Sequence, residues 1–169
     1  LEFRRVLFRS FEAAGASFDL LVDRCTGSFR PPFEKLAYNV QVESRGRDGA
    51  EAGPALPRTE ATVKLVVAEQ VRHEVAEGDG PVNALDDALR AALLPVYPQL
   101  KDVRLVDYKV RILTPEEGTK AVTRVMIESA DDAGNRWATV GVSANVIDAS
   151  YNALHDSITW KLFHAGASA

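Results

Sequence analysis

The sequence contains one cysteine, Cys25, in 169 residues, and no apolar run near the roughly 20 residues that span a bilayer. A single cysteine excludes an internal disulfide and a cysteine-based zinc cluster, and it favours a reducing compartment. The net charge of −4 gives no basic surface for nucleic acid. We therefore expect a cytoplasmic domain that binds neither nucleic acid nor a membrane.

Residues that carry catalysis are also scarce. The chain has three histidines: His73, His155 and His164. None has a metal-ligand spacing such as H-x-H or H-E-x-x-H, and neither G-x-S-x-G nor a phosphate-binding loop is present. The acidic pairs Asp86-Asp87 and Asp131-Asp132 are interpreted as solvated helix and turn positions. The sequence thus predicts no catalytic residue and no metal site, which disfavours a self-contained enzyme.

What is present is a globular composition, with 46% hydrophobic and 26% charged residues. A chain of this length buries enough surface to fold without disulfides or metal. The first ten residues, LEFRRVLFRS, have neither the apolar stretch nor the cleavage site of a signal peptide. We treat residues 1–10 as non-native sequence outside the domain.

A helix is expected in a linker region at 11–34, with Ser10 as its N-cap. Its apolar residues fall at helical spacing: Phe11, Ala14, Phe18, Leu21, Val22 and Cys25. Gly27 should end the helix, and Pro31 and Pro32 prevent its continuation. This stripe predicts that Cys25 is a small buried core residue rather than a reactive thiol.

Residues 35–165 show one pattern written twice, at about 35–100 and 101–165. Period-two alternation of apolar residues predicts strands at 36–42, 61–67, 71–75, 106–112, 121–127 and 137–142. A glycine- and proline-rich loop occupies 44–59. Apolar helical faces follow the strands, from Val82 to Leu93 in the first copy and from Ile147 to Leu162 in the second.

The expected fold class is α+β: two βββα repeats, with antiparallel sheets packed on helices, preceded by the linker helix. Tyr38 and Tyr108 hold equivalent places in the two copies. A single unit leaves a sheet face and a helix stripe uncovered, and two stacked units bury both. Because arrays of only two repeats usually need a further surface, we expect a homodimer.

The most informative feature is the loop-to-helix junction E-G-D-G-P-V-N-A-L. Gly78 and Gly80 permit unusual backbone shapes, and Pro81 suits the first helical position. Free N–H groups and the helix dipole would favour a carboxylate there, although a plain helix-capping turn is the alternative. The segment from Gly141 to Asn145 has the same design.

Two such junctions beside apolar strands would suit a small amino acid. Its carboxylate would meet backbone N–H groups, and its aliphatic tail would meet Leu105, Tyr108 and Ile112. Tyr108 and Ile112 can equally be core residues. Leu105 lies on the opposite strand face from them unless a bend intervenes.

Distinctive segments include EGDGPVNALDDAL, LVDYKVRIL, VMIES and TVGVSANVIDASYNAL. They resemble the C-terminal regulatory domain of the 2-isopropylmalate synthase family. The segments PVNALDDALRAALLPVYPQL and VSANVIDASYNALHDSITWKL are most similar to the citramalate synthase branch, and FEAAGASFDLLVDRCTG resembles its linker helix. The resemblance covers about residues 11–162.

The resemblance implies a regulatory and dimerisation domain of an acyltransferase that condenses acetyl-CoA with a 2-oxo acid. That reaction takes place in a separate, metal-dependent TIM barrel, so this chain should need no cofactor and be inactive alone. The implied partners are a second copy, the barrel of the parent chain, and L-isoleucine or L-leucine as feedback inhibitor. The inhibitory signal would reach the barrel through the linker helix containing Phe18 and Leu21.

By position, the resemblance implies an effector site made of Gly78, Asp79, Gly80, Leu105, Tyr108, Ile112, Thr119, Val122, Ala144 and Val146. The family commonly has asparagine in place of Asp79, and often proline in place of Ala144. Asp79 would attract the ammonium of an amino acid and repel its carboxylate.

Three alternatives stay open. The first is a leucine sensor of an isopropylmalate or homocitrate synthase, because one methyl group changes affinity by only about 1–3 kcal/mol. The second is a dimerisation module without effector binding, because Asp79 would repel the carboxylate of an amino acid. The third is the disfavoured self-contained enzyme.

Overall fold

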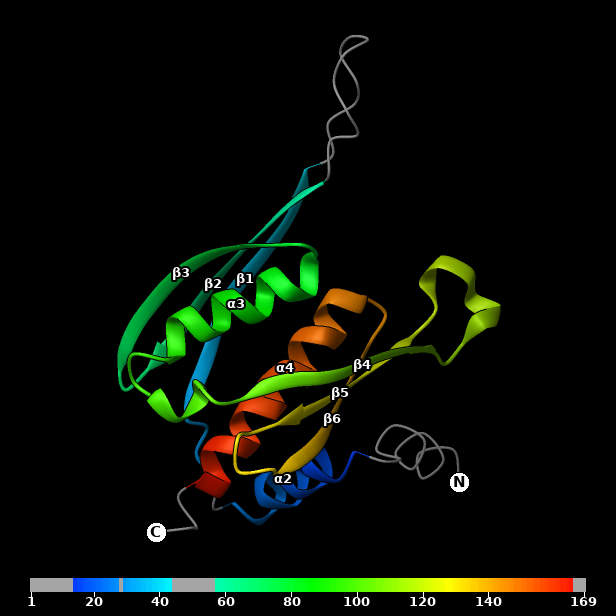
Figure 1. The fold of residues 1–169 in the computed structure, drawn as a ribbon. Helices are drawn as coiled ribbons and strands as arrows, with labels where there is room; N and C mark the ends of the chain where they lie inside the picture. The colour runs from blue at the N-terminus through cyan, green and yellow to red at the C-terminus, as the bar shows by residue number, and fades with distance from the viewer. Residues whose placement is uncertain (1–13, 28, 44–56, 166–169) are drawn as a thin grey trace, which may run out of the picture. The chain divides into compact units, whose positions relative to one another are not determined.

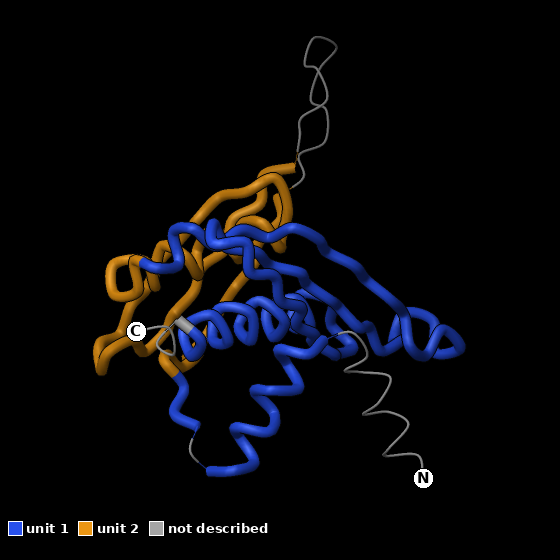
Figure 2. The backbone as a smooth tube through the Cα atoms, turned by 60° about the horizontal axis from the view of Figure 1, so that its bottom comes forward, with its two compact units in different colours: residues 1–31, 99–169 blue, residues 32–98 orange. Residues whose placement is uncertain are grey.

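The computed structural model describes residues 14–27, 29–43 and 57–165, which form two compact units (Figure 2). Unit 1 consists of residues 1–31 and 99–169, and unit 2 of residues 32–98. The expected cap at Ser10 and most of the expected loop at 44–59 lie outside the described residues.

Unit 2 is a three-stranded antiparallel sheet in the order β1-β2-β3, with one helix packed on it (Figure 1). Its elements are β1 (Phe33–Glu43), β2 (Arg58–Val67), β3 (Gln70–Gly78) and α3 (Pro81–Leu93). Pro81 opens α3, as predicted. The buried face of α3 is entirely apolar: Ala84, Leu85, Ala88, Leu89, Ala92 and Leu93. It confirms the predicted stripe except at its start, where Ala84 is buried and Val82 is half-buried.

Unit 1 repeats this plan with a second sheet, in the order β4-β5-β6, and adds the N-terminal helix. Its elements are α2 (Gly15–Thr26), β4 (Arg104–Ile112), β5 (Thr123–Ala130), β6 (Arg136–Ser143) and α4 (Val146–Ala165). Helix α4 packs on β5 and β6, and α2 lies against α4 and β6 (Figure 1). Short 3-10 helices occupy Pro98–Leu100 and Pro115–Lys120. The predicted α+β fold of two βββα repeats is confirmed.

The two sheets agree even in an irregularity. The register shifts between Lys35 and Ala37 in β1, and between Leu105 and Asp107 in β4. Each shift is a β-bulge, in which one extra residue turns the strand before pairing resumes. Tyr38 and Tyr108 follow these bulges at equivalent places, which extends the repeat from sequence pattern to backbone detail.

The predicted apolar stripe of α2 is wrong beyond Ala14, and Phe11 lies outside the described residues. The helix buries Ala14, Ala16, Ser17 and Leu20, whereas Phe18 is 53% exposed and Val22 and Cys25 are also exposed. Cys25 follows Leu20 by five residues, about 140° around the helix, and so faces away from the core. The predicted stop is confirmed, because Gly27 caps α2 in the left-handed conformation with φ of 76°.

Of the carboxylates expected to be solvated, Asp131 is buried and Asp86 is half-buried. Asp131 accepts hydrogen bonds from Asn135 in the β5–β6 turn and from Lys161 of α4. The hydrogen bonds from Lys161 and Asn135 hold the pKa of Asp131 well below its usual range. Burial raises the pKa of Asp86, against the opposing effect of its ion pair with Arg90.

Candidate functional site

The candidate effector residues of β4 share one face of the sheet because of the bulge. Leu105 and Tyr108 are three residues apart, so regular alternation would put them on opposite faces. Their β5 partners are Ser129 and Ile127, which are two residues apart and therefore point the same way. Ile112 lies four residues beyond Tyr108, on the same face. The bend that the sequence analysis required for Leu105 is thus present.

This face is only partly covered by α4. Tyr108 is half-buried, and its hydroxyl lies 2.9 Å from the Oγ atom of Ser150 on α4. Ile112 is 56% exposed, so in this chain it is no core residue. β4 therefore carries an apolar surface that begins beside α4 and continues into the open.

The N-terminus of α4 is already capped. The Asn145 side chain accepts a hydrogen bond from the Ile147 N–H at 2.8 Å, and the Asp148 N–H lies 3.4 Å from the same oxygen. These are the N–H groups that a carboxylate would otherwise use. Ala144 and Val146, which flank Asn145, are exposed.

The N-terminus of α3 is arranged differently. Gly80 is its N-cap and supplies no side-chain hydrogen bond. The Asp79 N–H donates to Asn83 Oδ1 at 3.1 Å. Neither glycine has the positive φ that was expected to explain it. Gly78 is required by close packing, because a Cβ atom there would lie 2.5 Å from the Ala84 nitrogen.

Thr119 and Val122 lie at the far end of the β4–β5 hairpin, beyond Ile112 (Figure 1). Thr119 is exposed on the 3-10 helix there, and Val122 is half-buried. The Val122 N–H donates to Thr114 Oγ1 at 2.8 Å, which closes this end of the hairpin.

Sequence reasoning missed a set of buried polar contacts between α4 and its sheet. Ser157 Oγ lies 2.7 Å from Ser129 Oγ and accepts from Trp137 Nε1 at 2.9 Å. Thr139 Oγ1 donates to the Ala153 carbonyl at 2.8 Å. The sequence signal for these contacts is the pair Ser150 and Ser157, two small polar residues seven positions apart on the apolar face of a helix.

A second missed network fixes α2 to the rest of unit 1. Ser17 Oγ accepts from the Val140 N–H of edge strand β6 and donates to Asp156 of α4, both at 3.0 Å. Arg24 pairs with the same carboxylate at 2.7 Å. Burial raises the pKa of Asp156. Hydrogen bonds from His155, Arg24 and Ser17 lower this pKa by more than burial raises it, so the net shift is downward.

Within residues 14–27, 29–43 and 57–165, no group of three or more metal-ligating side chains comes together. No helix in the described part of the chain is both long enough and apolar enough to span a membrane.

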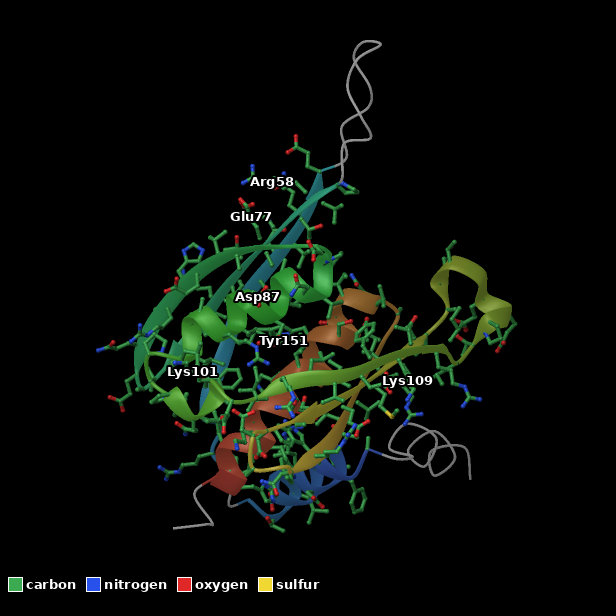
Figure 3. The ribbon with its side chains drawn as sticks, in the orientation of Figure 1. Arg58, Glu77, Asp87, Lys101, Lys109 and Tyr151 are labelled. Carbon is green, nitrogen blue, oxygen red and sulfur yellow. The ribbon has the colours of Figure 1, made fainter. Side chains whose placement is uncertain are left out.

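A hollow at the ends of β1 and β2 is lined by polar side chains: Gln41, Glu43, Arg58 and Glu60. Arg58 forms an ion pair with Glu77 of β3 at this end of the sheet (Figure 3). None of these residues belongs to the expected effector set.

The amino-acid sequence was compared with known protein families. The family profile of the LeuA allosteric (dimerisation) domain matches residues 12–162. This chain belongs to that family.

Similar proteins of known function are larger enzymes. The (R)-citramalate synthase of Geobacter sulfurreducens is 49% identical over 152 residues, which cover 90% of this chain and 28% of that enzyme. The (R)-citramalate synthase of Streptomyces coelicolor is 47% identical over 161 residues, or 94% and 28%. The 2-isopropylmalate synthase of Aquifex aeolicus is 34% identical over 98 residues, or 58% and 17%. The chain thus spans little more than a quarter of the citramalate synthases it matches.

Proposed function

We propose that this LeuA-type domain is the amino-acid-sensing and dimerisation domain of an acetyl-CoA-dependent acyltransferase of the citramalate synthase type. The observation that carries the proposal is the identity of 47–49% to (R)-citramalate synthases over at least 90% of the chain. The proposed effector is L-isoleucine, and the parent enzyme is proposed to act in cytoplasmic branched-chain amino acid synthesis.

The open face of β4 supports this proposal physically. Leu105, Tyr108 and Ile112 form an apolar surface that an aliphatic side chain would cover. Removing such surface from water contributes about 25 cal/mol per Å² of apolar area. Val122 and Val146 are proposed to add to this apolar contact, with Thr119 and Ala144 beside them.

The polar part of the effector is proposed to bind at Gly78, Asp79 and Gly80. The N-terminus of α3 has no side-chain cap at Gly80, so its first-turn N–H groups suit a carboxylate better than those that Asn145 caps on α4. Asp79 is exposed and is proposed to attract the ammonium group.

A homodimer is proposed as the working form. Apolar side chains lie exposed on the sheets, including Val71 at 59% and Val75 at 54% of their surface. Sedimentation equilibrium of the chain should give twice the 18.4 kDa monomer mass. A monomer at micromolar concentration would contradict this part of the proposal.

The effector assignment is tested by titration calorimetry of Tyr108→Ala with L-isoleucine. The substitution removes the aromatic wall, so binding should weaken at least tenfold, which is about 1.4 kcal/mol. Tyr38→Ala is the matched control, because Tyr38 holds the equivalent place in unit 2. Unchanged binding by folded Tyr108→Ala would refute the assignment.

Two other outcomes separate the alternatives. Stronger binding of L-leucine than of L-isoleucine would move the chain to the 2-isopropylmalate synthase branch, to which it is also similar. A folded dimer that binds neither would be a dimerisation module, and Asp79→Asn would then be the first variant to titrate.

A further inference from the structure

Two of the proposed effector residues are joined by a serine that belongs to neither the strand nor the junction. Tyr108 lies on edge strand β4, and Val146 is the first residue of α4. Ser150 lies one helical turn further along α4 and is fully buried. Its Oγ atom is 2.9 Å from the Tyr108 hydroxyl and 2.7 Å from the Val146 carbonyl oxygen.

The direction of these two hydrogen bonds follows from counting protons. A carbonyl oxygen only accepts, so the single hydroxyl proton of Ser150 is donated to Val146. The lone pairs of Ser150 Oγ are then left to accept from Tyr108, whose hydroxyl must be the donor. The Tyr108 side chain is therefore held at its Cα atom by strand β4 and at its hydroxyl group by Ser150 in α4.

We propose that Ser150 is a positioning residue for the effector site. It holds the Tyr108 ring against the first turn of α4 and so sets the space left for an aliphatic side chain next to Ile112 and Val146. Without the hydrogen bond, the ring would be free to rotate about its χ1 angle over the open part of the strand. This inference rests on the proposed function, and it adds a residue that contacts no effector itself.

The inference predicts that removing either partner of the Ser150–Tyr108 hydrogen bond has the same effect on L-isoleucine binding. In titration calorimetry, Ser150→Ala and Tyr108→Phe should each weaken L-isoleucine binding about fivefold, the usual effect of one lost hydrogen bond. The double variant should be no weaker than either single variant. The preference for L-isoleucine over L-leucine should fall in all three, because a mobile ring shapes the site less sharply.

Ser157→Ala is the matched control. It removes a hydroxyl from the same helix, one that contacts Trp137 and Ser129 instead of Tyr108. It should lower stability and leave both the affinity and the preference unchanged. If Ser150→Ala fails to fold, Tyr108→Phe still tests the inference, because it removes the same bond from the exposed end.

The failures of the inference and of the proposed function look different. Unsubstituted chain that binds no branched-chain amino acid overturns both. If the unsubstituted chain binds, Tyr108→Ala abolishes binding, and Ser150→Ala and Tyr108→Phe bind with unchanged affinity and preference, only the positioning role is overturned. Independent, additive losses in the double variant would also overturn it.

Discussion

The helices α3 and α4 occupy the same place in two copies of one fold, yet different chemistry holds them there. All six buried residues of α3 are alanine or leucine. On α4, buried and hydrogen-bonded Ser150, Asp156 and Ser157 accompany the apolar residues. The buried face of α3 is thus held by non-directional apolar packing, and that of α4 by hydrogen bonds of fixed geometry as well.

The difference follows from the number of neighbours. In unit 2 one face of α3 meets the sheet, whereas in unit 1 α4 meets β5 and β6 and also the helix α2. A helix buried on more than one side gains from hydrogen bonds to its buried polar groups, because an unpaired buried group costs about 1–3 kcal/mol. Ser150, Asp156 and Ser157 of α4 make such bonds. Directional bonds also fix position more tightly than apolar contacts, which suits the unit that carries Tyr108.

The largest expected effect is the loss of apolar packing in unit 2. Leu89→Ala removes a fully buried side chain from α3 and should lower the free energy of unfolding by about 4 kcal/mol. Urea unfolding followed by circular dichroism measures this. Ser157→Ala in unit 1 should cost less, about 2 kcal/mol, and the reverse order would break the contrast between the units.

The next effect tests how closely α4 approaches its sheet. A Cβ atom at Gly141 would lie 1.9 Å from the Ala149 carbonyl oxygen, so Gly141→Ala should destabilise unit 1 by about 3 kcal/mol. Both tryptophans, Trp137 and Trp160, lie in unit 1, so their fluorescence reports on this unit. Gly15→Ala, where the new Cβ meets open space, is the control. Equal stability of the two variants would contradict the packing of α4 on β6.

A smaller effect concerns the attachment of α2. Asp156→Asn weakens the hydrogen bonds to Ser17 and Arg24 and should cost about 2 kcal/mol at pH 7. In an enzyme that carries this domain, the same change should weaken feedback inhibition while the isolated domain still binds effector. Asp19→Asn, at an exposed position of α2, should alter neither property.

The pH dependence of stability also tests the hydrogen bonds and ion pair of Asp156. The pKa of Asp156 is lowered in the folded chain, so its contribution is complete above the unfolded carboxyl pKa of about 3.9. It is lost as the pH falls through the lower folded value. Unfolding of Asp156→Asn, measured from pH 6 to pH 2, should therefore show a shallower loss of stability than the unsubstituted chain. Parallel curves would mean that Asp156 is not paired as described.

Patterns of period two and 3.6 predicted most elements of both repeats, because apolar residues alternate along the strands and the stripe of α3 has one clear buried face. The orientation of α2 was not predictable in this way. Its sequence has apolar residues around much of the helix, and Ser17 decides which face is buried by bonding to distant Val140 and Asp156. Such contacts join residues more than 120 positions apart and leave no periodic signal.

The candidate site was predictable only as a set of positions. The bulge that turns Leu105 onto the face of Tyr108 depends on pairing with β5, which the sequence of β4 does not encode alone. Ser150 was overlooked because a serine between apolar helix residues is usual at a solvated edge. Here it is buried because Tyr108 supplies its partner.

The central claim is that this chain senses an amino acid, and titration calorimetry of the unsubstituted chain with L-isoleucine, compared with L-leucine, tests it most directly. The account predicts saturable binding of L-isoleucine and weaker binding of L-leucine. Absence of heat with both, from a folded dimer, would contradict it.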